Sequence, residues 1–282
     1  MKIAILSDIH GNAAALQPVL ADIAAWQPDH VIVNGDVVNR GPESAACWQM
    51  IKTQQTQPGW QVLGGNHEAY VCKHARSIPD PEHVGIQAAI NQNSRWTYQQ
   101  LNGQVAELAA LPAVASLSAP DGSELRATHA STRANDDGIY PSSTDEAICA
   151  QIAPAPAVFV TSHIHAAYIR QVNGALLVNT GSAGQLCDGD TRASYARVVW
   201  RQGQWRAQIV HVPYDRAETE RAFFASGFMD ETGPMARIIF YEWQTAVPLL
   251  PLWRATYMTA VLAGTITLER SVSDFLQQHD LS

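Results

Sequence analysis

Short apolar runs that stop abruptly at polar residues set the pattern of the first part of the chain. Residues 1–6, 31–34 and 61–64 form three such runs, and each suits a buried strand. Residues 13–26 carry apolar positions at helical spacing, and a second helix is expected over 42–51. Because strands and helices alternate, the pattern predicts a largely parallel sheet that is flanked by helices.

After residue 113 the pattern changes to pairs of β-prone runs with turn residues between them. The turn segments are Pro120-Asp121-Gly122, Asn173-Gly174 and Gln202-Gly203. Asn-Gly is the strongest hairpin signal of the three. We therefore expect a second, more antiparallel sheet that packs face to face on the first. The predicted fold class is α/β, with a two-layer β core and helices outside.

The last 70 residues predict helices rather than strands. Residues 245–268 are apolar enough to suggest a membrane span, but Pro248, Pro251 and Arg254 interrupt them, and a span needs ~20 consecutive, mostly apolar residues. We expect instead a helical extension that packs on the core, or that forms a contact between the subunits of a homo-oligomer. The predicted division is a core domain over 1–212, with a helical insertion at about 69–113, and an extension over 213–282.

Composition and charge exclude several classes of partner. The chain has 18 basic and 26 acidic residues, so its net charge of -8 provides no positive field for a nucleic-acid backbone. Its four cysteines are far apart, with no Cys-x-x-Cys motif, which indicates reduced thiols. No charged-then-apolar leader precedes the first strand, as is typical of a cytoplasmic protein. We expect neither a nucleic acid nor a membrane as partner.

The residues at which five apolar runs end are of the types that bind metal ions. They are Asp8 and His10, Asp36, Asn66 and His67, His129, and His163 and His165. In an α/β protein, the carboxyl ends of the strands form the edge at which ligands bind. Alternate residues of an extended segment share a face, so one metal ion can bind Asp8 and His10 together.

The combined set predicts a centre with two divalent metal ions. Asp36 offers a carboxylate that can bridge two cations, Asn66 offers a carbonyl oxygen, and the mixed nitrogen and oxygen set suits Mn, Fe, Zn, Ni or Co. Two ions ~3.5–4 Å apart would leave positions for water and substrate oxygens. Taken singly, Asp8 fits an Asx turn, Asp36 fits a helix cap, and the histidines fit surface positions. These alternatives fail jointly, because they require a coincidence at every strand end.

Five short motifs resemble those of one known family. They are D-x-H at 8–10, G-D-x-x-x-R-G at 35–41, G-N-H-E at 65–68, the lone His129, and x-H-x-H at 162–165. The set and its order are similar to those of the calcineurin-like metallophosphoesterase superfamily, and residues 178–195 resemble its small bacterial members. The resemblance implies a four-layer αββα sandwich of two mixed sheets, with a dinuclear metal centre at the strand ends.

The resemblance also implies a role for each site residue. One ion would be held by Asp8, His10, Asp36 and His165, and the other by Asp36, Asn66, His129 and His163. Arg40 and His67 would meet the phosphoryl group beside Asn66, and His67 would protonate the leaving oxygen. Two positions depart from the family pattern. Ser162 replaces a common Gly, and Asn39 replaces an Asp that supports the catalytic histidine in many members, with Glu68 as a candidate substitute.

The leading hypothesis is a metal-dependent hydrolase of small-molecule phosphomonoesters or phosphodiesters, nucleotide-derived ones included, in which a bridging hydroxide attacks phosphorus. The alternatives are a catalytically weak family fold that serves as a protein-binding scaffold, and a nuclease, which the acidic charge disfavours. The insertion and the extension are expected to select the substrate. Tyr70 and Trp96 would either line a pocket or pack the flank of the domain.

Overall fold

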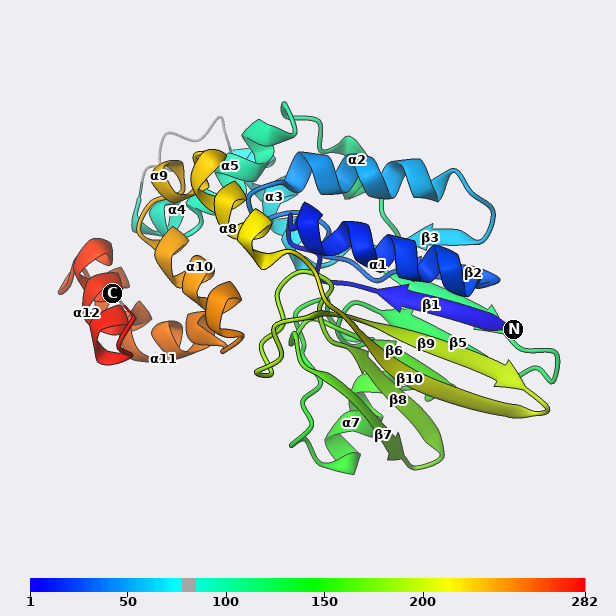
Figure 1. Ribbon diagram of the computed structural model, residues 1–282. Helices are drawn as coiled ribbons and strands as arrows, with labels where there is room; N and C mark the ends of the chain where they lie inside the picture. The colour runs from blue at the N-terminus through cyan, green and yellow to red at the C-terminus, as the bar shows by residue number, and fades with distance from the viewer. Residues whose placement is uncertain (78–84, 282) are drawn as a thin grey trace.

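Two stacked β-sheets with helices on both outer faces form the body of the molecule (Figure 1). The computed structural model describes residues 1–77 and 85–281. The first sheet contains, in spatial order, β10 (Gln204–Val212), β9 (Ala193–Arg201), β1 (Lys2–Leu6), β2 (His30–Val33) and β3 (Trp60–Val62). The second contains β4 (Val114–Ser118), β5 (Glu124–Thr128), β6 (Val158–Thr161), β8 (Ala175–Thr180) and β7 (Ala167–Val172).

Strand β1 is covered on both faces, which explains why it is apolar at nearly every position. Ile3 and Ile5 are buried between the two sheets, whereas Ala4 and Leu6 face the helical layer, because successive side chains of a strand point to opposite faces. That layer consists of α1 (Ala13–Trp26) and α2 (Ser44–Gln55). Helix α7 (Asp145–Ile152) covers the outer face of the second sheet (Figure 1). The predicted αββα sandwich is confirmed.

The hairpin turns were placed correctly by the sequence, but the assignment of the last hairpin to the second sheet is wrong. The β9–β10 hairpin completes the first sheet, where β9 pairs antiparallel with β1. The centre of the second sheet is parallel, since β5 pairs with β6 and β6 with β8 in that sense. Without β9, the edge of β1 opposite β2 would expose a row of backbone N–H and C=O groups, and the returning hairpin satisfies them. Local turn chemistry does not specify which sheet a hairpin joins.

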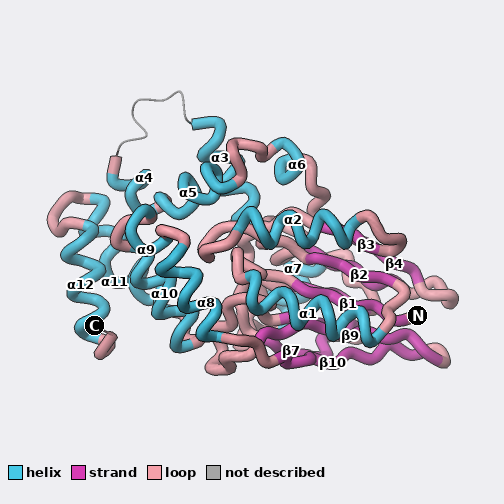
Figure 2. The backbone as a smooth tube through the Cα atoms, turned by 45° about the horizontal axis from the view of Figure 1, so that its top comes forward, coloured by secondary structure: helices cyan, strands magenta, loops and turns pink. Residues whose placement is uncertain are grey.

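The insertion and the C-terminal extension pack on each other at one end of the molecule (Figure 2). The described part of the insertion contains α3 (Asn66–Ser77), α4 (Ile86–Ile90), α5 (Gln92–Gln100) and α6 (Ala106–Ala109). The extension contains α8 (Arg216–Ala225), α9 (Phe228–Glu231), α10 (Met235–Thr245), α11 (Leu249–Leu262) and α12 (Leu268–Gln278). Residues 78–84, which belong to the predicted insertion, lie outside the described residues.

Trp96 is a core residue of this helical end rather than part of a pocket wall. Its indole is buried, and its ring centroid lies 5.1 Å from that of Phe228 in an edge-to-face contact. Ile90 of α4 packs in the same cluster as Trp253 of α11. The extension therefore shares its core with the insertion, and a subunit contact through it stays a prediction. Within residues 1–77 and 85–281, no helix is long and apolar enough to cross a bilayer.

Candidate metal centre

The loops after five strands meet at the edge shared by the two sheets. Strands β1, β2 and β3 are parallel, as are β5 and β6, so their carboxyl ends lie on one side. The structure brings the predicted ligands together there: Asp8, His10, Asp36, Asn66, His129, His163 and His165. All are buried except His163, which is half-buried.

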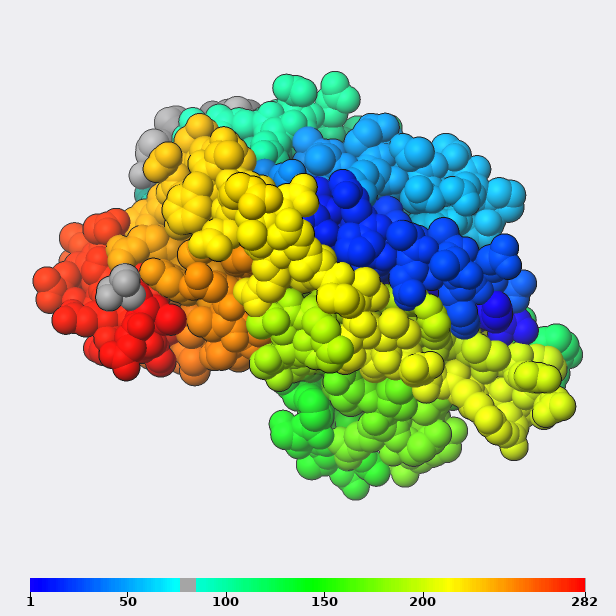
Figure 3. All heavy atoms as spheres, viewed as in Figure 1, coloured from blue at the N-terminus to red at the C-terminus, as the bar shows by residue number. Residues whose placement is uncertain are grey.

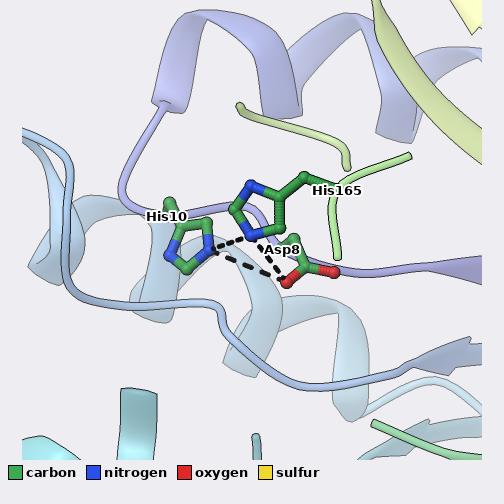
Figure 4. Close-up of side chains that lie close together, drawn as sticks. All are labelled: Asp8, His10 and His165. Atoms are coloured by element: carbon green, nitrogen blue, oxygen red, sulfur yellow. Dashed lines mark hydrogen bonds and ion pairs between the residues drawn. The ribbon is translucent and has the colours of Figure 1, made fainter. Parts of the chain in front are cut away.

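One group of donor atoms consists of Asp8, His10 and His165 (Figure 4). The Nε2 atoms of the two imidazoles are 3.0 Å apart. Asp8 Oδ1 lies 3.2 Å from Nε2 of His165 and 3.7 Å from Nε2 of His10. Ligands at about 2.0–2.2 Å from a tetrahedral metal ion are separated by about 3.3–3.6 Å. These spacings are thus close to those of one coordination shell.

A second group lies next to the first and is built on Asp36. Asp36 Oδ2 is 3.2 Å from Nε2 of His129, and it is also 3.8 Å from Nε2 of His10 in the first group. Asn66 Oδ1 lies 3.0 Å from Nε2 of His129 and 2.9 Å from Nδ1 of His163. Asp36 therefore faces both groups, which is the position the sequence predicts for a bridging ligand, and Asp8 Oδ1 lies 4.0 Å from Nε2 of His129.

Two buried carboxylate oxygens fit a centre that binds cations. Within the described part of the chain, Asp8 Oδ1 and Asp36 Oδ2 have no hydrogen-bond donor, although both are shielded from solvent. A buried carboxylate oxygen without a hydrogen bond is costly unless a cation compensates it. Each of these oxygens faces imidazole nitrogens, so both point into the two groups of ligands. The donor set fits divalent transition metals that accept nitrogen and oxygen ligands.

The electrostatics of His129 lead to the same conclusion. Its Nδ1 lies 2.8 Å from the carbonyl oxygen of Asn34, which directs Nε2 toward Asp36. Burial lowers the pKa of His129, but the negative charges of Asp36 and Asp8 outweigh burial and raise the pKa to about 10. The carboxylates thus hold a positive charge on the imidazole, and a metal ion would supply that charge in place of the proton.

The backbone around the ligands is in an unfavourable conformation. Asp8, His10, Asp36, His163 and His165 all have positive φ, between 48° and 67°. The prediction that Asp8 and His10 share the face of an extended segment is wrong. Both residues follow the end of β1 and have left-handed backbone conformations. Such conformations cost of order 1–3 kcal/mol each and concentrate at functional sites.

Two motif glycines permit the close approach of these loops. A Cβ atom on Gly65 would lie 2.1 Å from Asp36 Oδ1, and one on Gly41 would lie 1.8 Å from the carbonyl oxygen of His10. Only Gly fits where backbones approach this closely. The glycines of G-N-H-E and of G-D-x-x-x-R-G thus allow the ligand loops to pack against one another.

The comparisons with known proteins agree with this geometry. A model of the calcineurin-like phosphoesterase superfamily domain matches residues 1–203. The chain belongs to the calcineurin-like phosphoesterase superfamily. An uncharacterised protein of Methanocaldococcus jannaschii is 26% identical over 231 residues, which are 76% of this chain and 88% of that protein.

Two solved structures share the fold. One is a metallophosphoesterase from Sphaerobacter thermophilus, with a TM-score of 0.62 and 24% identity over 88% of this chain and 100% of that chain. The other is a hypothetical protein from Pyrococcus horikoshii, with a TM-score of 0.68 and 18% identity over 83% of this chain and 97% of that chain. Both matches extend beyond residues 1–203 and therefore include part of the helical extension.

Ser162, which replaces a common Gly of the calcineurin-like pattern, is accommodated by hydrogen bonds. Its hydroxyl accepts a hydrogen bond of 2.9 Å from Nδ2 of Asn34 and lies 2.8 Å from the hydroxyl of Thr180. A buried hydroxyl with partners on both sides carries little penalty. The His163 and His165 loop is therefore held in place despite the substitution.

Asn39 contacts His67 and determines which ring nitrogen carries the proton. Asn39 Oδ1 accepts a hydrogen bond from the backbone N–H of Arg40 at 3.0 Å, which can only donate, so the orientation of the amide is fixed. Its Nδ2 therefore donates to Nδ1 of His67 at 3.0 Å. The proton of a neutral His67 must then be on Nε2. Burial also holds the pKa of His67 well below its ordinary value.

Glu68 does not substitute for the missing Asp. Its buried carboxylate accepts hydrogen bonds from the backbone N–H groups of Asp36, Val37, Val38 and Gly65, at 2.8–3.2 Å. Because all four bonds go to the backbone, Glu68 clamps the loop after β2 onto the start of α3. Its role is to hold Asp36 in position, and the side chain that directs His67 is Asn39.

Glu242, a residue of the extension that the sequence did not indicate, lies against the predicted phosphate-binding arginine. This side chain is 1% exposed, and its Oε1 lies 3.2 Å from Nη1 of Arg40. Oε1 also accepts from Nε2 of Gln185, and Oε2 accepts from the backbone N–H of Leu250. Residues 40 and 242 are far apart in sequence, and Glu242 lies outside the matched family domain, so no local pattern pairs them.

Replacing Glu242 by Ala is expected to destabilise the protein by about 3 kcal/mol or more, because it leaves the Arg40 guanidinium buried without its anion. Chemical denaturation of purified protein measures the loss. Glu269→Ala is the matched control, since Glu269 forms an exposed ion pair with Arg237 and should contribute less than about 1 kcal/mol. Equal stability losses in the two variants would contradict a structural role for the buried pair.

Proposed function

We propose that this protein is a metal-dependent hydrolase of small-molecule phosphoesters that uses two divalent transition-metal ions. The observation that carries the proposal is the pair of buried, unpartnered carboxylate oxygens, Asp8 Oδ1 and Asp36 Oδ2, among the histidine nitrogens. Membership of the calcineurin-like phosphoesterase superfamily supports the reaction class. One ion would be held by Asp8, His10, Asp36 and His165, and the other by Asp36, Asn66, His129 and His163.

Two side chains beside the ligands act on the phosphoryl group in this proposal. When bound, the metal ions supply positive charge and a nucleophile at neutral pH. Arg40, whose Nε is buried without a hydrogen-bond partner among the described residues, donates to the phosphoryl oxygens. His67 donates a hydrogen bond from Nε2 to the leaving oxygen, because Asn39 already donates to its Nδ1.

The test combines metal analysis with a substrate panel. The purified protein is loaded separately with Mn, Fe, Zn, Ni and Co and is assayed on phosphomonoesters, cyclic and linear phosphodiesters, and dinucleoside polyphosphates. We expect about two bound ions per chain and hydrolysis of at least one class with at least one metal. A protein that binds no divalent metal, or that binds metal and hydrolyses none of the panel, would overturn the proposal.

A further inference from the structure

A recess opens beside the metal centre, and residues of the C-terminal extension form one wall of it. Its enclosed volume is about 30 Å³, and the value rises to about 390 Å³ only when the open solvent at its mouth is counted, so a bound group would lie largely in the mouth. Arg40, His67 and Tyr70 line it on the side of the metal centre, and the extension contributes Ile239, Leu250 and Arg254. His67, the proposed hydrogen-bond donor to the leaving group, therefore lies in the wall of the recess. Figure 3 shows the extension as one mass at this end of the molecule.

Four buried apolar side chains line the recess. Ile239 and Leu250 are 3% and 7% exposed, and they are joined by Ile90 and Met235, while the buried Asn39 and Ser94 line it on the side of His67. The apolar side chains favour an apolar or aromatic body in the recess. Polar groups occur at the rim, where Asn91 and Asn93 lie.

Two arginines line the recess, and Glu242 forms an ion pair with one of them. Its oxygens accept from Arg40, Gln185 and the N–H of Leu250. Arg254 forms no ion pair or hydrogen bond with any described residue, and its side chain is exposed. The surrounding protein and then the charge of Arg40 lower the pKa of its guanidinium, against the opposing effects of Tyr70 and Glu242. The donors of Arg254 are therefore free to bind an anion that enters from solvent.

We propose that the recess binds the leaving group of the substrate and that Arg254 binds a second anionic group on it. The substrates are then phosphoesters whose leaving group joins an apolar body to a carboxylate or a second phosphate. This inference rests on the hydrolase function proposed above. An arginine with free donors is suited to either anion, because its planar fork matches the oxygens of both. The extension, outside the matched family domain, thereby selects the substrate.

The test uses three aryl esters: phenyl phosphate, 4-carboxyphenyl phosphate and 1,4-phenylene bisphosphate. In the wild type, kcat/KM should be higher than for phenyl phosphate with at least one of the two esters that carry a second anionic group, and the better of the two identifies that group. Arg254→Gln should reduce that preference by about 10-fold or more, since a hydrogen-bonded charge pair is lost. Arg254→Lys should retain part of it. Arg270→Gln, which removes an exposed arginine paired with Asp274 on α12, is the control and should leave the preference unchanged.

A binding measurement separates the failure of this inference from that of the proposed function. Calorimetry compares benzylphosphonate with 4-carboxybenzylphosphonate, which are not hydrolysed, on the metal-loaded protein. Loss of the preference for the carboxylated compound in Arg254→Gln supports the inference even in an inactive preparation. Equal binding of the two compounds by the wild type, together with equal kcat/KM for all three esters, would overturn it while leaving the hydrolase function intact. If no phosphonate binds and no ester is hydrolysed, the proposed function itself fails and the inference with it.

Discussion

Asp36→Asn is expected to abolish tight binding of at least one of the two metal ions and to reduce hydrolysis to near background. Asp36 faces both groups of ligands, with Oδ2 at 3.2 Å from His129 and 3.8 Å from His10, whereas Asp8 Oδ1 is 4.0 Å from His129. A neutral amide bridges two cations poorly and removes a negative charge that both ions feel. Elemental analysis after dialysis at a fixed free metal concentration measures the ions retained per chain.

The folded state should survive this substitution. Asp36 Oδ1 accepts a hydrogen bond from the backbone N–H of His67 at 2.8 Å, and the carbonyl oxygen of Asn can do the same. Asn also removes a buried charge whose Oδ2 has no hydrogen-bond partner among the described residues. Asp121→Asn, in the turn of the β4–β5 hairpin away from His129, is the matched control and should retain both ions. Two tightly held ions in Asp36→Asn would show that the bridging assignment is wrong.

The ligands were predictable because each follows an apolar run, and parallel strands present their carboxyl ends at one edge. The local reason given for Asp8 and His10 was wrong, since both occupy left-handed backbone, which a period-two pattern does not reveal. The identities of the residues and their order along the chain were sufficient to locate the centre. The strain of the ligand loops depends on contacts between loops that are distant in sequence, such as Gly65 with Asp36.

The contacts of the extension also could not be predicted from the sequence, because they depend on tertiary packing between distant segments. In the sequence, Arg254 only interrupts an apolar segment, and no motif includes Glu242. Both acquire a role through tertiary packing, since α10 and α11 lie against the insertion and Arg40. Trp96 is the opposite case, because tertiary packing buries it and removes it from a pocket wall. Its ring packs against Phe228, which a neighbouring helix supplies.

Replacing His67 by Ala is expected to lower kcat by about 10²–10³-fold while both metal ions stay bound, which is the usual loss for one preorganised donor. The imidazole is not among the predicted ligands, and its Nδ1 is occupied by the amide of Asn39. Because a neutral imidazole donates a hydrogen bond but does not readily release its proton, the loss should vary little between aryl and alkyl phosphates. A loss that grows steeply with the basicity of the leaving group would show full proton transfer instead.

Asn39→Asp tests the same assignment from the other side of the ring. A carboxylate at this position would accept a hydrogen bond from Nδ1–H of His67, favour the imidazolium and raise the pKa of the imidazole. The variant should therefore gain activity on alkyl phosphates relative to aryl phosphates. When His67→Ala is added to Asn39→Asp, kcat should fall more for alkyl esters than for aryl esters. Nitrogen-15 chemical shifts of His67 in the metal-free protein report the change directly. In the wild type, the neutral ring should carry its proton on Nε2. In Asn39→Asp, the ring with both nitrogens protonated should persist to a higher pH than in the wild type. If Nδ1 carries the proton in the wild type, the amide of Asn39 does not direct the ring, and hydrogen-bond donation by Nε2 is excluded as the role of His67.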